Sequence, residues 1–453
     1  MRTGASFCSS GRTDQATPNL LLNAIQVESL DQEGRGVAHA EGKVIFIQGA
    51  LPGELVTYAS YLKKPRYELA QVQQVIKPAA TRTTPRCRHF AMCGGCSLQH
   101  LDARAQVASK QRVLEDSLRH IGKVFPDSIL PAIYGEPWGY RYRARFSARY
   151  VMKKGGALVG FREKHSSHVT DMTTCEVVPP RIAALLLPLR ELINKLSIPD
   201  RLPQIELAIG DGTDALILRI LQPIDADDER LLREFADRHH VQLFLQLRGL
   251  DSVEPFYPAH SGVLFYALPE FALNIGFSPA EFTQVNHGVN AVLVRRALAL
   301  LEPRPGERIA DMFCGLGNFT LAIARSGAAV VGYEVSRSLV IRAESNAEGN
   351  GLSASAGFVQ ADLFKLDADS LARLGRFDRM LIDPPRDGAV ALIKALAQDA
   401  PRRIVYVSCN PATLARDAGV LVHVKGYVLS AAGVINMFPH TSHVESIAVF
   451  DRP

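Results

Sequence analysis

The last third of the chain alternates between short β-rich segments and stretches with helical periodicity. From about residue 291 the segments predicted as strands are Arg308–Phe313, Ala329–Val335, Gly357–Ala361, Phe377–Ile382, Arg403–Ser408, Tyr427–Val434 and Ser446–Phe450. Helical stretches lie between most of them. This alternation predicts an open, mostly parallel α/β sheet, a fold that binds ligands at the carboxyl ends of its strands.

Acidic residues and glycines follow the first three of these strands. Asp311 leads into a loop in which Gly315 and Gly317 permit a tight turn and close approach of a ligand. Glu334 ends the second strand, where a carboxylate can accept from both hydroxyls of a ribose, and Asp362 ends the third. A dinucleotide loop would carry a third glycine. The combination resembles the S-adenosylmethionine pocket of class I methyltransferases, with a generic nucleotide-binding sheet as the alternative.

The fourth and fifth strands are followed by segments that can carry chemistry. Asp383 begins a rigid Asp-Pro-Pro-Arg sequence, which is similar to a tetrapeptide of amino-methyltransferases except that Arg386 replaces the usual aromatic residue. Cys409 lies just beyond the fifth strand, where loop amides can lower the pKa of a thiol; an inert buried cysteine is the alternative. Glu445 leads into the last strand and can face the same crevice as a general base.

A cysteine in a methyltransferase suggests an unreactive carbon as the acceptor. Addition of a thiolate to carbon 6 of uracil makes carbon 5 nucleophilic, and a base must then remove the hydrogen from carbon 5. Cys409 and Glu445 fit these two steps. Two other hypotheses remain: an amino-methyltransferase whose activity does not need Cys409, and an RNA-binding assembly factor that does not bind S-adenosylmethionine.

Five segments together resemble the motif set of the RNA uracil-5-methyltransferase family: SCNPATLARD, IDPPR, DMFCGLGNF, FTQVN and HVESI. The resemblance implies a class I S-adenosylmethionine-dependent methyltransferase (Rossmann-like) fold, with Cys409 as nucleophile and Glu445 as base. It also implies that the cofactor and the substrate are bound by Gln284, Phe313, Asn318, Glu334, Asp362 and Asp383.

Three of the seven cysteines stand within ten residues, and a fourth follows far along the chain. Four thiolates suit either a zinc ion or an iron–sulfur cluster, and their spacing does not distinguish the two. The resemblance implies a [4Fe-4S] cluster. Its ligands would be Cys87, Cys93, Cys96 and Cys175. Of the other cysteines, Cys314 is expected to pack in the core and Cys8 to lie in a tail.

The N-terminal part is predicted to be a small all-β unit. Its β-rich runs are Leu20–Val27, Gly36–Ala40, Lys43–Ile47, Glu54–Tyr61 and Tyr67–Ile76. Five short strands predict an OB-type barrel, and the interleaved tyrosines and cations suit single-stranded nucleic acid. Within the family, this segment resembles a TRAM domain. A structural spacer with a solvated lysine loop is the alternative.

The net charge of +5 is unevenly distributed. Residues 1–170 carry 24 Lys and Arg against 13 Asp and Glu, so the remainder of the chain is acidic. This imbalance indicates either a polyanion-binding part or a solvated basic surface. Trp138–Tyr150 alternates aromatic residues with arginines, which predicts a strand with one positive face or an ordinary amphipathic strand.

We therefore expect four parts: a disordered tail at 1–18, a TRAM/OB barrel at 19–78, a mixed α+β central domain at 79–270 with the cysteine cluster, and the catalytic domain at 271–453. A helix over 103–121 can dock on the catalytic domain. Its apolar stripe would be Val107, Val113, Leu114, Leu118 and Ile121.

No apolar run is long enough for a membrane helix, and the N-terminus lacks the apolar core of a signal peptide, so we expect a cytoplasmic protein. Barrel, cluster and catalytic domain together are similar to the bacterial branch of the family that makes 5-methyluridine in 23S ribosomal RNA. The expected substrate is a locally single-stranded segment with the target base flipped out, and not DNA. A second 23S site or transfer RNA is the alternative, and a monomer is expected.

Overall fold

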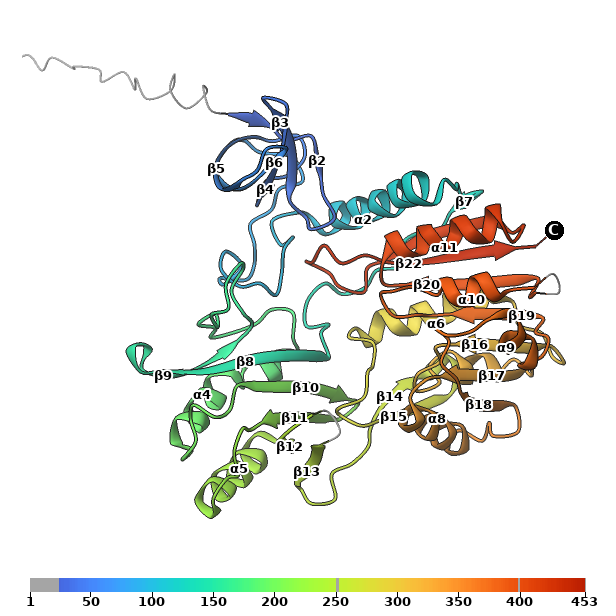
Figure 1. Ribbon diagram of the computed structural model, residues 1–453. Helices are drawn as coiled ribbons and strands as arrows, with labels where there is room; N and C mark the ends of the chain where they lie inside the picture. The colour runs from blue at the N-terminus through green and yellow to red at the C-terminus, as the bar shows by residue number, and fades with distance from the viewer. Residues whose placement is uncertain (1–23, 250–251, 398–399, 453) are drawn as a thin grey trace, which may run out of the picture. The chain divides into compact units, whose positions relative to one another are not determined.

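The computed structural model describes residues 24–249, 252–397 and 400–452, which form two compact units that divide after Thr83 (Figure 1). The expectations for the tail at 1–18 and for Cys8 lie outside the described residues. No helix in the described part of the chain combines the length and the apolar character needed to cross a membrane.

The first unit is a six-stranded sheet in the order β1-β5-β6-β4-β3-β2. The strands are β1 (Ile25–Gln26), β2 (Ser29–Leu30), β3 (Gly36–Ala40), β4 (Lys43–Gln48), β5 (Leu55–Lys63) and β6 (Tyr67–Lys77). β1 and β2 are the two edges of this sheet, yet only Val27 and Glu28 separate them. Because β1 pairs with β5 and β2 pairs with β3, this short segment closes the sheet into a barrel.

A buried ion pair joins the residues after β6 to this barrel. Glu54 is fully buried, and its carboxylate accepts hydrogen bonds from the Arg82 guanidinium and from the backbone N–H groups of Leu51 and Ala79. Arg82 also donates to the carbonyl of Gly49 at 2.6 Å. Residues 79–83 therefore belong to the barrel unit, past the expected boundary at residue 78.

The first half of the second unit is built around a mixed sheet in the order β13-β12-β11-β10-β8-β9. Its strands are β8 (Arg143–Val151), β9 (Gly156–Gly160), β10 (Gln204–Gly210), β11 (Thr213–Arg219), β12 (Val241–Gln246) and β13 (Val253–Tyr257). Helices α3 (Pro180–Ala183), α4 (Leu186–Lys195) and α5 (Ala226–His239) belong to this part. Leucines of α4 and α5 share a core with one face of the sheet.

The hairpin β14 (Leu264–Leu268) and β15 (Leu273–Phe277) joins the two halves of this unit. Its apolar residues pack with Ala208 and Phe244 of the central sheet and, in the same core, with the catalytic sheet. The expected boundary at residue 270 falls at the turn of this hairpin. Residues 84–452 accordingly form one compact unit.

The strand predicted across Trp138–Tyr150 is shorter than expected. β8 begins only at Arg143, so Arg141 lies before it, with its guanidinium bonded to the carbonyl of Arg143 at 3.0 Å. Arg145 and Arg149 do lie on one exposed face, although Arg145 pairs with Glu206 at 2.9 Å. The positive face therefore comprises fewer free cations than the sequence indicated.

The catalytic part is a doubly covered sheet in the order β18-β17-β16-β19-β20-β22-β21-β7. Its strands are β16 (Arg308–Met312), β17 (Ala329–Glu334), β18 (Ala356–Gln360), β19 (Arg379–Ile382), β20 (Arg403–Ser408), β21 (Val428–Ile435), β22 (Glu445–Asp451) and the short β7 (Ser128–Ile129). The first five are parallel and β22 is antiparallel to both neighbours. All seven predicted strands are present, which confirms the predicted α/β architecture.

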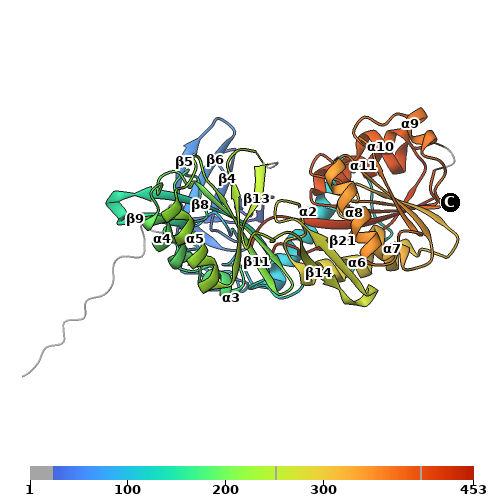
Figure 2. The same cartoon turned by 90° about the horizontal axis from the view of Figure 1, so that it is seen from below.

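Helices cover both faces of this sheet (Figure 2). α6 (His287–Leu301), α7 (Thr320–Ala324) and α8 (Arg337–Gly349) pack on one face, with the hairpin. α9 (Ala368–Arg373), α10 (Val390–Ala395) and α11 (Pro411–His423) pack on the other, together with α2 (Ala103–Ser117) and the π-turn η1 (Leu118–Gly122). The order of the parallel strands reverses between β16 and β19, which places a ligand crevice at their carboxyl ends.

Helix α2 packs most of its predicted apolar stripe against the core and buries polar residues beside it, and Val107 and Val113 are partly buried against that core. Leu114 and Leu118 are buried as expected, but Ile121 is 49% exposed because η1 ends the regular helix. Gln106 and Lys110 are buried instead, at 1% and 2% exposure. The predicted helix is present, and three of its four buried residues, Gln106, Lys110 and Ser117, are polar.

Candidate active site

Strand register places the predicted nucleophile beside the predicted base. Ser408, the last residue of β20, pairs with Ser446 of β22, so Cys409 and Glu445 extend from neighbouring strands at the same edge. Asp383 follows β19, whose last residue Ile382 pairs with Tyr406 of β20. The structure therefore brings Asp383, Cys409 and Glu445 together at the carboxyl edge of the sheet, where the sequence predicted a crevice.

The pKa shifts of Cys409 and Asp383 show that these side chains lie close enough to Glu445 to feel its charge. The expectation that loop amides leave Cys409 with a lowered pKa is wrong, because burial raises the pKa of this thiol to about 11 and the negative charges of Glu445 and Asp383 add to the effect. Burial likewise raises the pKa of Asp383 to about 8, with contributions from Glu445 and Asp311. Glu445 is 6% exposed, and its Oε2 atom has no hydrogen-bond partner among the residues that the structure describes. A buried carboxylate oxygen without a partner is available to accept a proton.

The glycine loop after β16 is held against the acidic residue of β17. Gly315 and Gly317 both adopt positive φ angles of 53° and 87°, a conformation that favours glycine. Glu334 accepts from the N–H of Gly315 at 3.2 Å and from the N–H of Ser336 at 2.9 Å. A Cβ atom at Gly315 would meet nothing within 4 Å, so there is open space in front of the loop.

Asp311 stands at the base of this loop and is completely buried. Its Oδ2 atom accepts from the Thr320 hydroxyl at 2.5 Å, while its Oδ1 atom has no partner in the described part of the chain. Burial raises the pKa of Asp311 to about 7. Asp311 therefore keeps one unpaired carboxyl oxygen at the base of the loop.

Phe313, Asp362 and Phe364 lie on one side of the loop. The rings of Phe313 and Phe364 are tilted against each other with their centroids 5.5 Å apart, and Phe364 is 44% exposed. Asp362 accepts from the Phe364 N–H at 3.1 Å and pairs with Lys365 at 2.9 Å, which lowers its pKa. Phe364 was not singled out from the sequence, although its position two residues after Asp362 was a usable signal.

Asn318 is tied to the scaffold. Its side chain exchanges two hydrogen bonds with Asn290 of α6, at 3.0 and 3.1 Å, and accepts a third from the Tyr266 hydroxyl at 2.9 Å. Gln284 is half-buried on the segment before α6. Asn286, the N-cap of this helix, reaches the carbonyl of Met437 at 3.5 Å, so the same segment contacts the chain that leads to Glu445.

Asn410, the N-cap of α11, and residues of this helix hold the loop that carries Asp383. Asn410 and Thr413 both donate to the carbonyl of Arg386, at 3.1 and 3.2 Å. Asp417, completely buried, accepts from the Ala389 N–H at 2.7 Å and from the Tyr406 hydroxyl at 2.8 Å. These residues of the SCNPATLARD segment therefore fix the position of Asp383 relative to Cys409, a structural role that the motif alone does not reveal.

The four predicted ligand cysteines line one small pocket and are all buried. Burial raises the pKa of Cys96 to about 12, and the other three thiols are close enough to add to the shift. A Cβ atom at Gly95 would lie 2.9 Å from the Phe161 ring, so only glycine permits the chain to pass there. No group of three or more His, Cys, Asp or Glu in the described ranges is arranged to hold a single metal ion.

Cys314 is buried beside Gly332, where a Cβ atom would lie 2.8 Å from its sulfur. This agrees with the expected packing role.

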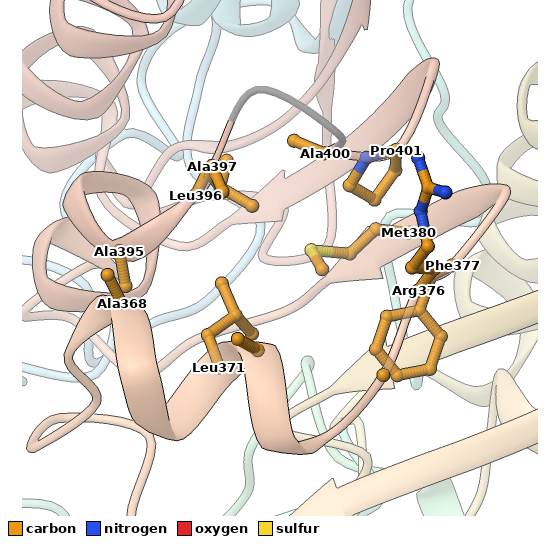
Figure 3. A pocket seen from close by; sticks show the side chains of 12 residues that line it. Ala368, Leu371, Arg376, Phe377, Met380, Ala395, Leu396, Ala397, Ala400 and Pro401 are labelled. Carbon is orange, nitrogen blue, oxygen red and sulfur yellow. The ribbon is translucent and has the colours of Figure 1, made fainter.

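An apolar pocket lies apart from this edge. It is lined by residues of α9 and α10, including Leu371, and by Phe377 and Met380 near the start of β19 (Figure 3). Asp383 follows the opposite end of the same strand. The pocket is therefore separate from the group around Cys409.

The strand order and the acidic crevice define a class I S-adenosylmethionine-dependent methyltransferase fold. Among solved structures, the chain superposes on Pyrococcus abyssi tRNA (uracil-54, C5)-methyltransferase in complex with S-adenosyl-L-homocysteine with a TM-score of 0.75, covering 94% of this chain and 99% of that one. The two are 24% identical in sequence, so this likeness supports the fold.

Sequence comparisons identify the family. A family model described as tRNA (Uracil-5-)-methyltransferase matches residues 273–452. The chain is 65% identical over 430 residues to the 23S rRNA (uracil(1939)-C(5))-methyltransferase RlmD of Nitrosospira multiformis, covering 94% of this chain and 98% of that protein. It is 58% identical over 428 residues to RlmD of Dechloromonas aromatica, with coverage of 94% and 99%. The chain therefore belongs to the RNA uracil-5-methyltransferase family.

Proposed function

We propose that this protein transfers a methyl group from S-adenosylmethionine to carbon 5 of a uridine in 23S ribosomal RNA. The observation that carries the proposal is the pairing of β20 with β22, which sets a cysteine and a buried carboxylate side by side at the carboxyl edge of a methyltransferase sheet. The relatives with 65% and 58% identity are named for this activity on 23S rRNA, which supports the same substrate.

Cys409 starts the reaction and is regenerated at its end. The thiolate adds to carbon 6 of the uracil, and the electron pair of the 5,6 double bond moves onto carbon 5 and the adjacent carbonyl. S-adenosylmethionine supplies the methyl group, which carbon 5 takes up as the sulfur–methyl bond breaks and S-adenosylhomocysteine leaves. Glu445 removes the proton from carbon 5, the double bond forms again, and the carbon–sulfur bond breaks to release Cys409.

The residues at the edge of the sheet fit a nucleoside-containing cofactor. The buried Oδ1 atom of Asp311 has no partner, and open space lies in front of Gly315. We propose that Glu334 accepts from the ribose hydroxyls, and that Asp362 and the Phe313 ring hold the adenine. Since the amide of Asn318 is bonded within the scaffold, it would act by holding the glycine loop. Gln284 and Asp383 would complete the cofactor site, and Asp383 would also reach the edge of the uracil.

The RNA would be held by the basic part of the chain. The barrel of residues 24–83 exposes Tyr61 and Tyr67, aromatic side chains that suit stacking with unpaired bases, and we assign it as a TRAM domain. Arg145 and Arg149 expose positive charge on β8. A uracil inside a helix cannot reach Cys409, so the target base would be flipped into the crevice.

The four buried cysteines line one pocket, and we propose that they hold the [4Fe-4S] cluster that the family resemblance implies. Backbone N–H groups also bond to their sulfurs, from Gly95 to Cys93 and from Val177 and Val178 to Cys175, as expected around thiolate ligands. When bound, the cluster would fix the fold around residues 87–98, since no step of the reaction requires an electron.

The test is to map 5-methyluridine in 23S and transfer RNA from cells that lack this protein. We expect one 23S position to lose its methyl group, and to regain it with the wild-type gene but not with Cys409→Ala. Loss of 5-methyluridine from transfer RNA alone would contradict the assignment of 23S rRNA as the substrate. Restoration by Cys409→Ala would overturn the mechanism.

A further inference from the structure

The segment that carries Glu445 is held by a buried lysine from a distant part of the chain. Residues 436–444 connect β21 to β22, and Glu445 is the first residue of β22. Lys110 of α2 donates to the Asn436 side chain at 2.7 Å and to the carbonyl of Phe438 at 2.8 Å. Its side chain is only 2% exposed. A fully buried ammonium is costly unless a specific charge or acceptor set compensates for it.

Both acceptors that Lys110 contacts are neutral, so its counter-charge must lie further away. The carboxylate that acts on the ammonium is Glu445, which opposes the effect of burial on the pKa of Lys110. Burial is the larger effect and lowers this pKa to about 7. Asp383 and Asp311 lie close to one another and Asp383 lies close to Glu445, so Lys110 interacts with a carboxylate at an edge rich in acidic groups.

Gln106, one turn before Lys110, holds the same segment at a second point. Its side chain accepts from the His440 N–H at 2.8 Å and contacts the His440 ring at 3.2 Å. His440 stacks on Trp138 with the ring centroids 3.8 Å apart. The buried polar face of α2 therefore fixes the segment from Asn436 to His440, which leads to Glu445, whose Oε2 atom has no partner among the described residues.

We propose that Lys110 is a positioning residue for the base: from α2 it holds the segment that leads to Glu445 and balances the charge of this carboxylate, so that Oε2 stays aligned to take the proton from carbon 5. This inference rests on the proposed function, because it assigns a step to Glu445. It predicts a defect confined to the second half of the reaction, since adduct formation and methyl transfer precede removal of the proton.

The experiment measures the two halves separately in the full-length protein. Rapid quench on a labelled 23S rRNA fragment, with S-adenosylmethionine present, follows formation of the covalent complex and its release as methylated RNA. In Lys110→Met, we expect release to slow about a hundredfold, the effect of a catalytic group displaced by roughly 1 Å, while complex formation is unchanged. Arg112→Met is the matched control, because this cation on the same helix has a side chain that is 72% exposed.

The double variant with Glu445→Gln separates positioning from general damage. If Lys110 acts through Glu445, adding Lys110→Met to Glu445→Gln slows neither complex formation nor release any further. Slower complex formation in either background, or normal release in Lys110→Met, would overturn the inference. A failure of Glu445→Gln to accumulate the complex would instead overturn the proposed role of Glu445.

A second variant covers the case in which Lys110→Met does not fold. Lys110→Gln removes the charge but keeps an amide donor for the two acceptors, so the fold is easier to retain. Trp138 is the single tryptophan and stacks on the held segment, so its fluorescence reports whether the segment is in place. We expect Lys110→Gln to slow release with an unchanged emission spectrum. Wild-type release rates in this variant would refute the charge contribution.

Discussion

Replacing Asp417 should destabilise the second unit strongly, because this side chain links α11, β20 and the loop after Asp383. In Asp417→Ala, the Ala389 N–H and the Tyr406 hydroxyl both lose their acceptor inside the core. Each buried donor without a partner costs about 1–3 kcal/mol, so the free energy of unfolding should fall by about 4 kcal/mol. The bond to Arg416 adds little, since that side chain is 40% exposed.

The measurement is urea unfolding of the full chain followed by the fluorescence of Trp138. This residue is the only tryptophan and lies in residues 84–452, so its transition reports the second unit separately from the barrel. The control is Tyr406→Phe, which removes one donor and should cost about 1.5–3 kcal/mol. The double variant Asp417→Ala/Tyr406→Phe should lower the free energy of unfolding by less than the sum of the two single variants, because no buried hydroxyl is then left without an acceptor. A cost below about 1 kcal/mol for Asp417→Ala, or strict additivity, would refute the reasoning.

Three further predictions concern other parts of the chain. The raised pKa of Cys409, about 11, means that the thiolate fraction grows with pH, so kcat/KM for methylation should rise from pH 6.5 to 9; a flat profile would contradict this. Cys96→Ser should abolish the brown colour and visible absorbance of anaerobically purified protein, whereas Cys314→Ser should keep both; equal absorbance would exclude the cluster assignment. Arg82→Met should destabilise the barrel by about 3–5 kcal/mol, because it leaves Glu54 buried without its cation, as hydrogen exchange of barrel amides would show. Unchanged hydrogen exchange of the barrel amides in Arg82→Met would contradict this last prediction.

The catalytic sheet could be predicted from sequence because its signals are local. Each strand is a short apolar run, and the residue after the strand lies at a known edge, so Asp383 and Cys409 could be placed together before any coordinates were known. Glu445 was placed at the same edge because it leads into the last strand. The barrel strands were also visible, since each is bounded by a turn signal.

The residues that support the site could not be found in this way. Gln106 and Lys110 occupy the buried face of α2 because they bond to a segment more than 300 positions away, whereas periodicity assigns burial to apolar residues. The expected boundary at residue 78 placed Arg82 outside the barrel, yet it completes the barrel through Glu54. In each case the partner of a polar side chain is distant in sequence, and composition carries no information about it.

The most direct test of the central claim is to trap the covalent intermediate. Glu445→Gln is incubated with a 23S rRNA fragment and S-adenosylmethionine labelled in its methyl group, and the products are separated under denaturing conditions. The account predicts a protein–RNA complex that carries the label and disappears when Cys409→Ala is added to Glu445→Gln. A labelled RNA product without any complex, or a complex that survives Cys409→Ala, would contradict the mechanism.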